Sequence, residues 1–152
     1  MCLVPRTWSA RADTVVAGVA PDLSSRAAVR FAAAEAEATA QRVCLVHAWE
    51  RPGFLEEAAW ATDAEEAQRE HLNIARNAAD EVRRAYPALT VVTSTPQSRP
   101  IAALIAEAAE ASMLVMGTHR RSGLSTLLHG SVVRGVLGRI EVPLCIVPPA
   151  DG

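Results

Sequence analysis

Short runs of apolar residues alternate along this chain with longer segments in which apolar residues recur at helical spacing. Continuous apolar runs of this length are typical of strands that are buried on both faces, as in a parallel sheet. A regular alternation of strand and helix places helices on both faces of such a sheet, through right-handed crossovers. We therefore predict a doubly wound α/β fold with a five-stranded parallel sheet. Its strands are expected at residues 14–19, 43–48, 89–94, 113–116 and 144–147.

Start signals mark the first two helices between these strands. Ser24 or Ser25 can cap the first helix, because a serine oxygen accepts hydrogen bonds from the free amides of a first turn. Residues 62–65 fit a capping box for the second helix, which is expected to run to about residue 86. Residues 49–61, which contain a Pro-Gly pair, are interpreted as a loop.

The length of the chain, 152 residues, suits a single hydrophobic core. We predict one domain over residues 14–149, with residues 1–13 as a loose N-terminal leader that lacks the apolar centre of a signal peptide. No apolar run approaches the roughly 20 residues that cross a bilayer, so no membrane partner is expected. A net charge of −2 gives no electrostatic reason to expect a nucleic-acid partner.

Missing or scattered residue types exclude several kinds of site. The chain contains no lysine, which excludes a Walker-type phosphate lysine and a Schiff-base lysine. Cys2, Cys44 and Cys145 show no CxxC spacing, and we interpret them as reduced core residues of a cytoplasmic protein. The histidines lie on different predicted elements without a carboxylate at ligand spacing, so no metal site is predicted.

Ligands of doubly wound sheets bind outside the carboxyl ends of the strands, where the strand order reverses. The loops after the first and fourth strands should therefore form the functional edge. His119, in the loop after the fourth strand, is the histidine expected near a ligand. His47, at the end of the second strand, is interpreted as a core or rim residue, and His71 is expected to face solvent.

The junction between the fourth strand and the fourth helix has features of a phosphate site. A glycine ends the strand, a polar loop follows, and the helix opens with a small hydroxyl residue. Such a junction directs free backbone N–H groups and the positive end of a helix dipole at one point. An ordinary strand-to-helix connection fits the same spacing. Along the chain, this junction runs through Met116, Gly117, His119, Arg120, Gly130 and Ser131.

The same junction resembles the phosphate-binding signature of the universal stress protein family: Gly, two residues, Gly, nine residues, Gly, and then Ser or Thr. Gly117, Gly130 and Ser131 stand at their places, whereas Arg120 stands where the second glycine is expected. The resemblance extends over about residues 14–148, and implies a Rossmann-like fold of the adenine-nucleotide alpha hydrolase-like type. The similar segments read VVAGVAPDLSSRAAVRFA, CLVHAW, ALIAEAAEASMLVMGTH and GSVVRGVLGRIEVPLCIVP.

The resemblance implies a stress-response protein with a pocket for ATP or AMP between the ends of the first and fourth strands. Gly18, Val19 and Ala48 would line the adenine slot, and the signature residues with Val132 would meet the phosphates. Mg²⁺ would bind only together with the nucleotide, and no catalytic residue is implied, so ATP hydrolysis would be weak at most. The candidate nucleotide-binding residues are Gly18, Val19, Ala20, Ala48, Met116, Gly117, His119, Arg120, Gly130, Ser131 and Val132.

Arg120 can be interpreted in two ways. A glycine at this position would let the backbone approach a phosphate closely. A side chain there costs about 1 kcal/mol of backbone strain or blocks the phosphate from entering the pocket. The guanidinium could instead donate two hydrogen bonds to the phosphates. Ala20 stands where the family typically has Asp, and Asp22 follows two residues later. The alternative function is therefore a dimeric interaction protein that binds no nucleotide and keeps a vestigial pocket.

The resemblance also implies a homodimer that pairs through the last strand, Leu144–Val147. An apolar strand at the edge of a sheet needs such a cover, because its unpaired backbone groups attract other strands. The identity of other protein partners, and of the stress itself, is not indicated by any motif.

Overall fold

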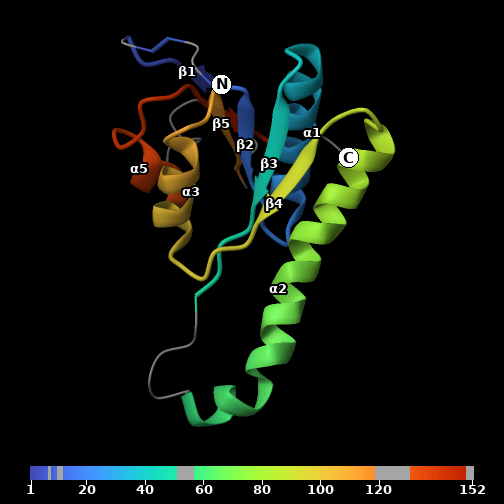
Figure 1. The fold of residues 1–152 in the computed structure, drawn as a ribbon. Helices are drawn as coiled ribbons and strands as arrows, with labels where there is room; N and C mark the ends of the chain where they lie inside the picture. The colour runs from blue at the N-terminus through green and yellow to red at the C-terminus, as the bar shows by residue number, and fades with distance from the viewer. Residues whose placement is uncertain (7, 10–11, 51–56, 119–130, 150–152) are drawn as a thin grey trace.

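The computed structural model describes residues 1–6, 8–9, 12–50, 57–118 and 131–149 (Figure 1). The strands in this part of the chain are β1 (Cys2–Leu3), β2 (Thr14–Gly18), β3 (Arg42–Val46), β4 (Val91–Ser94), β5 (Met113–Gly117) and β6 (Leu144–Val147). The helices are α1 (Leu23–Ala38), α2 (Glu57–Ala85), α3 (Pro100–Ala108) and α5 (Ser131–Val136).

The strands form one sheet in the order β1-β6-β5-β2-β3-β4. The strands β2 to β6 pair in parallel, which confirms the predicted α/β fold with a mostly parallel sheet. The predicted count of five strands is wrong, because Cys2–Leu3 forms a sixth strand, antiparallel to β6. This strand lies inside the segment predicted as a loose leader. Two residues are too few for a periodic signal, and their partner strand is at the other end of the chain.

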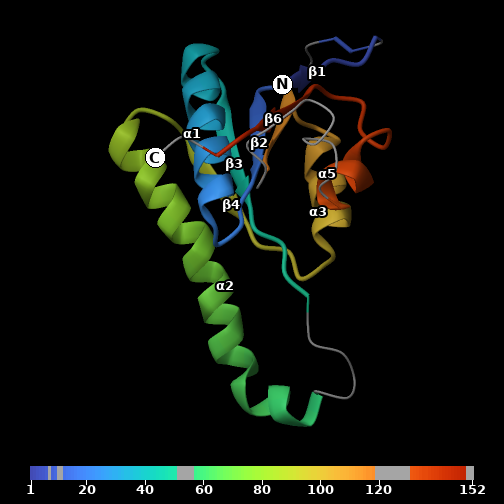
Figure 2. The same cartoon turned by 180° about the vertical axis from the view of Figure 1, so that it is seen from behind.

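Helices cover both faces of the sheet: α3 and α5 lie on one face, and α1 and α2 on the other (Figures 1 and 2). Successive side chains along a strand point to opposite faces. Val16 and Leu114 therefore enter the core beneath α3 and α5, while Val15 and Val115 enter the core beneath α1 and α2. All four side chains are at most 1% exposed, which explains why the strands read as continuous apolar runs.

The start of the second helix differs from the prediction. The helix α2 begins at Glu57, before the predicted capping box at residues 62–65, and so includes part of the predicted loop. Alanine-rich sequence there has high helix propensity and overrides the cap signal. The helix α5 ends at Val136, and Gly138 shortly after it adopts a φ of 79°, a conformation that favours glycine. Among the helices that the structure describes, none is both long and apolar enough to cross a bilayer.

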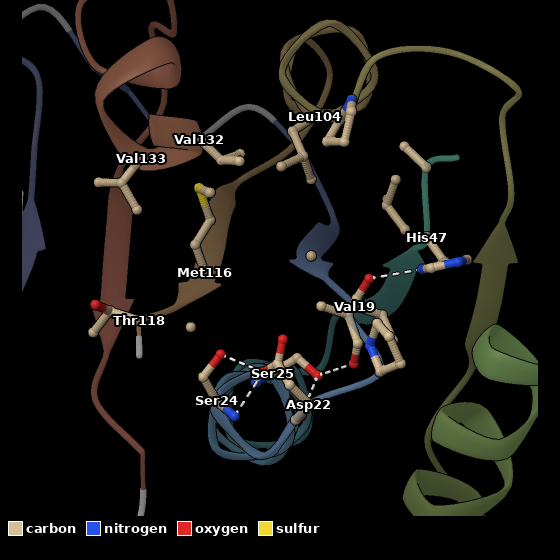
Figure 3. Close-up of a pocket in the computed structure, with 17 residues that line it drawn as sticks. Val19, Asp22, Ser24, Ser25, His47, Leu104, Met116, Thr118, Val132 and Val133 are labelled. Atoms are coloured by element: carbon tan, nitrogen blue, oxygen red, sulfur yellow. Dashed lines mark hydrogen bonds between the residues drawn. The ribbon is translucent and has the colours of Figure 1, made fainter. Parts of the chain in front are cut away.

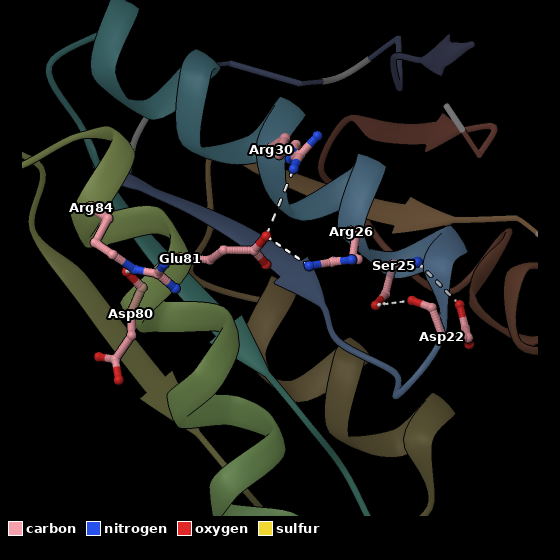
Figure 4. Close-up of polar contacts among 7 residues, drawn as sticks. All are labelled: Asp22, Ser25, Arg26, Arg30, Asp80, Glu81 and Arg84. Carbon is pink, nitrogen blue, oxygen red and sulfur yellow. Dashed lines mark hydrogen bonds and ion pairs between the residues drawn. The ribbon is translucent and has the colours of Figure 1, made fainter. Parts of the chain in front are cut away.

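Ion pairs join α1 to α2 above the apolar core (Figure 4). The Arg26 guanidinium donates to Glu81 Oε1 at 3.0 Å, and a nitrogen of Arg30 lies 3.7 Å from the same oxygen. The Arg26 side chain is 56% exposed, so water screens this pair and its contribution is at most about 1 kcal/mol. The two helices are held mainly by the buried contacts beneath, which include Ala79 and Val82 of α2.

Cys2 and Cys145 form a disulfide between β1 and β6. The prediction of reduced cysteines is therefore wrong for this pair. The two residues are 143 positions apart and carry no spacing signal, but the antiparallel register places them directly opposite each other. Cys44 is free and buried, and its burial, with a smaller contribution from Glu107, raises the pKa of the thiol to about 11. Cys44 is thus the inert core cysteine that the sequence predicts.

Candidate functional site

A pocket of about 530 Å³ opens at the carboxyl ends of β2, β3 and β5 (Figure 3). The neighbouring strands β2 and β5 are not consecutive in the chain, so the strand order reverses here. The volume lies within the roughly 300–1,000 Å³ of small-molecule sites. The described lining residues are Gly18, Val19, Ala20, Pro21, Asp22, Ser24, Ser25, Val46, His47, Ala48, Pro100, Leu104, Met116, Gly117, Thr118, Val132 and Val133.

The first turn of α1 forms a polar wall of this pocket (Figure 3). The Asp22 carboxylate accepts hydrogen bonds from the backbone N–H of Ser24 at 2.8 Å and of Ser25 at 3.2 Å. Asp22 is therefore the N-cap of α1, in place of the predicted Ser24 or Ser25. The Ser25 hydroxyl donates to the Ala20 carbonyl at 2.6 Å and fixes the turn between β2 and α1. The pocket wall thus contains a carboxylate at the positive end of a helix dipole.

Gly117 allows the end of β5 to approach the first turn of α1. A Cβ atom at Gly117 would lie 2.2 Å from the backbone oxygen of Ser24. Because the obstacle is backbone rather than a flexible side chain, no other residue fits without moving the helix. This glycine has a packing role that holds whether or not a phosphate contacts it.

His47, at the end of β3, is 5% exposed and has a partner at each ring nitrogen. Its Nδ1 lies 2.9 Å from the Val19 carbonyl oxygen, and its Nε2 lies 2.9 Å from Nδ1 of His71. A carbonyl only accepts, so we assign the proton to Nδ1 of His47, and in the neutral pair His71 donates to His47.

His71, on α2, also stacks on Trp49, with the ring centroids 4.8 Å apart. The prediction that His71 faces solvent is therefore wrong, because α2 brings its ring against β3. The chain His71–His47–Val19 connects α2 to the pocket wall.

Acid should weaken the fold through His71. Burial, followed by the neighbouring His47, lowers the pKa of His71 from its usual 6.5, against a smaller opposing effect of Glu70. The unfolded chain therefore binds this proton more readily than the folded chain. The stabilisation from neutral His71 is present above the unfolded pKa and is lost as pH falls through the lower folded pKa.

The measurement is the melting temperature of the wild type and of His71→Gln between about pH 7 and pH 5. The advantage of the wild type should shrink as the pH falls. The exposed Asn73 on the same helix provides the control, and Asn73→Gln should follow the wild-type profile. An advantage that stays constant over this range would contradict the assignment.

Several predicted site residues meet in this pocket, and others fall outside the described residues. His119, Arg120 and Gly130 lie outside them, and Ser131 begins α5 with a side chain that the structure does not describe. Contact of these residues with a nucleotide stays a prediction. The predicted residues that line the pocket are Gly18, Val19, Ala20, Ala48, Met116, Gly117 and Val132.

The polar wall was missed as part of the candidate site. Asp22 carries a detectable signal, because an Asp just before two serines at the start of a helical segment is an N-cap pattern. Thr118 follows Gly117 directly and could have been included on position alone. Leu104 of α3 is buried and lines the pocket, but helical spacing alone does not distinguish a pocket residue from a core residue. Within the described ranges, no group of three or more metal-ligating side chains occurs.

Comparison with known families gives the same answer as the resemblance in the sequence. The model of the universal stress protein family matches residues 12–148. The chain belongs to the universal stress protein family. Universal stress proteins of Mycobacterium tuberculosis and Mycobacterium bovis are each 30% identical over 132 residues, which is 87% of this chain. The match covers 44% of each relative, so this chain spans less than half their length.

Solved structures of the family share the fold. A universal stress protein in complex with cAMP is 26% identical, with a TM-score of 0.68 over 91% of this chain and 98% of that protein. A universal stress protein from Archaeoglobus fulgidus is 22% identical, with a TM-score of 0.68 over 90% and 98%. UspA from Lactobacillus plantarum is 16% identical, with a TM-score of 0.70 over 91% and 99%. The last two comparisons support the fold alone.

Proposed function

We propose that this universal stress protein binds an adenine nucleotide, ATP or AMP, in the pocket at the ends of β2 and β5. The observation that carries the proposal is the pocket of about 530 Å³ at the reversal of strand order. It is large enough for a small molecule, and predicted site residues from three strand ends line it. The related structure in complex with cAMP supports a nucleotide as the class of ligand.

The base would occupy the apolar part of the pocket. Leu104 and Met116 supply buried apolar surface from α3 and β5, on which a flat ring can pack (Figure 3). Gly18 and Ala48 also line this space, and their small size leaves room for the ring. Burial of the ring would then provide most of the affinity.

The phosphates would lie on the Thr118 side of the pocket rather than beside the Asp22 carboxylate, because like charges repel. Arg120 and Ser131 of the predicted signature follow Thr118 in the sequence. In a chain without lysine, an arginine is the strongest cation that can neutralise a phosphate. Mg²⁺ would arrive with the nucleotide, and we propose binding with at most weak hydrolysis.

Saturating Mg·ATP should raise the melting temperature of the wild-type chain. Ligand at 100 times its Kd adds about 2.7 kcal/mol, which corresponds to roughly 5–10 °C for a protein of this size. Ala48→Phe should fill the base slot and abolish the shift. Ala102→Phe is the matched control, since Ala102 is exposed on α3 and does not line the pocket. A wild-type melting temperature that does not change in millimolar ATP would contradict the proposal.

The second candidate function is a dimeric interaction protein with a vestigial pocket. Two observations favour it: Arg120 replaces a signature glycine, and the Asp22 carboxylate sits in the pocket wall. This function predicts a dimer whose melting temperature does not respond to ATP, so the same titration separates the two candidates.

Both candidates include a homodimer that pairs through β6. The side chains of Leu144, Cys145 and Ile146 are at most 2% exposed, so β6 is a core strand next to the edge of the sheet. Among the described residues, its outer side pairs with the two residues of β1 and with Met1, which precedes them. A β6–β6 dimer therefore requires β1 to move away.

A further inference from the structure

One covalent bond and a few hydrogen bonds hold β1 on the outer edge of β6. The Met1 nitrogen donates to the Ile146 carbonyl at 2.9 Å, and the Ile146 N–H donates to the Met1 carbonyl at 2.7 Å. In an antiparallel ladder, the pair next to such a doubly bonded pair has no mutual hydrogen bonds and has the closest side chains. Cys2 and Cys145 form this neighbouring pair, and a disulfide joins them.

Without the disulfide, little would keep β1 in place. Both residues of β1 are exposed. Met1 before them is half-buried against the core cluster, so the segment as a whole contributes little buried surface. Isolated pairing of two short strands is marginal in water. The strand β6, in contrast, is fixed from the other side by its parallel pairing with β5 and by its buried side chains. Loss of the disulfide should therefore release β1 and leave β6 where it is.

Release of β1 together with Met1 would leave the N–H and C=O of Ile146 unpaired at the sheet edge. Such an edge pairs readily with another strand. The sequence of β6, Leu-Cys-Ile-Val, contains no charged residue, so two copies would meet without like-charge repulsion. Two β6 strands related by a two-fold axis run antiparallel, which is the orientation in which this edge already accepts β1.

We propose that the Cys2–Cys145 disulfide is a redox latch on dimerisation: when oxidised it holds β1 over the β6 edge, and when reduced it opens that edge to β6 of a second copy. The inference rests on the β6 dimer proposed above and adds that the redox state of the disulfide regulates its formation. It is independent of whether the pocket binds a nucleotide.

A dithiol is the chemical class of reductant that opens the latch. One of its thiolates attacks the sulfur of the exposed Cys2, and Cys145 leaves as a thiolate that takes up a proton. The second thiol of the reductant then displaces Cys2 from the mixed disulfide. Two electrons pass from the dithiol to the protein, the dithiol becomes a disulfide, and both cysteines end as thiols.

Light scattering over a concentration series tests the latch on the full chain. The samples are the oxidised wild type, the wild type reduced with dithiothreitol, and Cys2→Ser, whose exposed position tolerates the change. Reduction and Cys2→Ser should each lower the dimer dissociation constant at least about tenfold relative to the oxidised protein. Cys44→Ala is the control, because Cys44 is free and its loss should leave the response to dithiothreitol intact.

Hydrogen exchange at the Ile146 amide reports the edge itself. This amide should exchange slowly in the oxidised protein, faster in dilute Cys2→Ser, and slowly again as that variant dimerises. Equal dimerisation of the oxidised wild type and Cys2→Ser would overturn the latch. It would also place the dimer contact on another surface, because β1 still covers the β6 edge in the oxidised protein. Absence of a dimer in every sample would overturn both. Slow exchange in dilute monomeric Cys2→Ser would show that β1 stays bound without the disulfide, which also overturns the latch.

Discussion

Replacing Ile146 with glutamate is expected to unfold the protein. Ile146 on β6 is 0% exposed and packs in the same core cluster as Val16 and Leu114. Loss of a buried isoleucine costs about 2–5 kcal/mol, and an unpaired carboxylate in the same place adds several more. The total is comparable with the whole stability of a domain, about 5–15 kcal/mol. Circular dichroism should show no cooperative melting transition.

Two variants isolate the cause of this effect. Ile146→Val keeps the site apolar and should cost only about 0.5–1.5 kcal/mol. Val92→Glu introduces the same charge on β4, the opposite edge strand, where Val92 is 42% exposed and the cost should stay within about 0.5 kcal/mol. A folded Ile146→Glu with wild-type melting would contradict the core position of Ile146. A charge at this position therefore cannot serve as a probe of the proposed dimer.

Gly117→Ala is expected to destabilise the protein by about 2–3 kcal/mol, because the new Cβ overlaps backbone that cannot rotate away. The overlap is with the carbonyl oxygen of Ser24, 2.2 Å from the ideal Cβ position. To accommodate it, β5 and α1 must separate at the pocket. Thermal denaturation should show a melting temperature roughly 5–10 °C below that of the wild type.

Gly18→Ala provides the matched control for this substitution. A Cβ at Gly18 would lie 3.4 Å from a methyl group of Leu104, which is close to ordinary contact with a flexible side chain. Its melting temperature should therefore stay near that of the wild type. If Gly117→Ala and Gly18→Ala had the same melting temperature, the contact between β5 and α1 would not be the reason for glycine at position 117.

The sheet was predicted well from the sequence because burial of a strand on both faces requires a local hydrophobic pattern. Each parallel strand must be apolar throughout, and the residues between strands must show helical spacing. The alternating strands and helices can therefore be identified along the sequence. β1 has no such pattern, because two residues show no period and Cys2 pairs with Cys145, 143 positions away in the chain. For the same reason, the disulfide could not be deduced from cysteine spacing.

The site was predictable where it depends on strand ends and not where it depends on helix docking. Gly117 follows from the rule that ligands bind beyond the carboxyl ends of parallel strands, and Gly18 and Ala48, which the family resemblance implied, line the pocket at the same edge. The contact of His71 with His47 depends on how α2 crosses the sheet, which no local pattern encodes. Asp22 was visible in the sequence, but its capping role was assigned to the serines that follow it.

Isothermal titration calorimetry of Mg·ATP into the wild-type chain and into Ala48→Phe tests the central claim most directly. The account predicts saturable binding of one nucleotide per chain to the wild type, and no binding to Ala48→Phe at the same concentrations. Absence of heat from the wild type, or equal binding by a folded Ala48→Phe, would contradict a nucleotide site at the ends of β2 and β5.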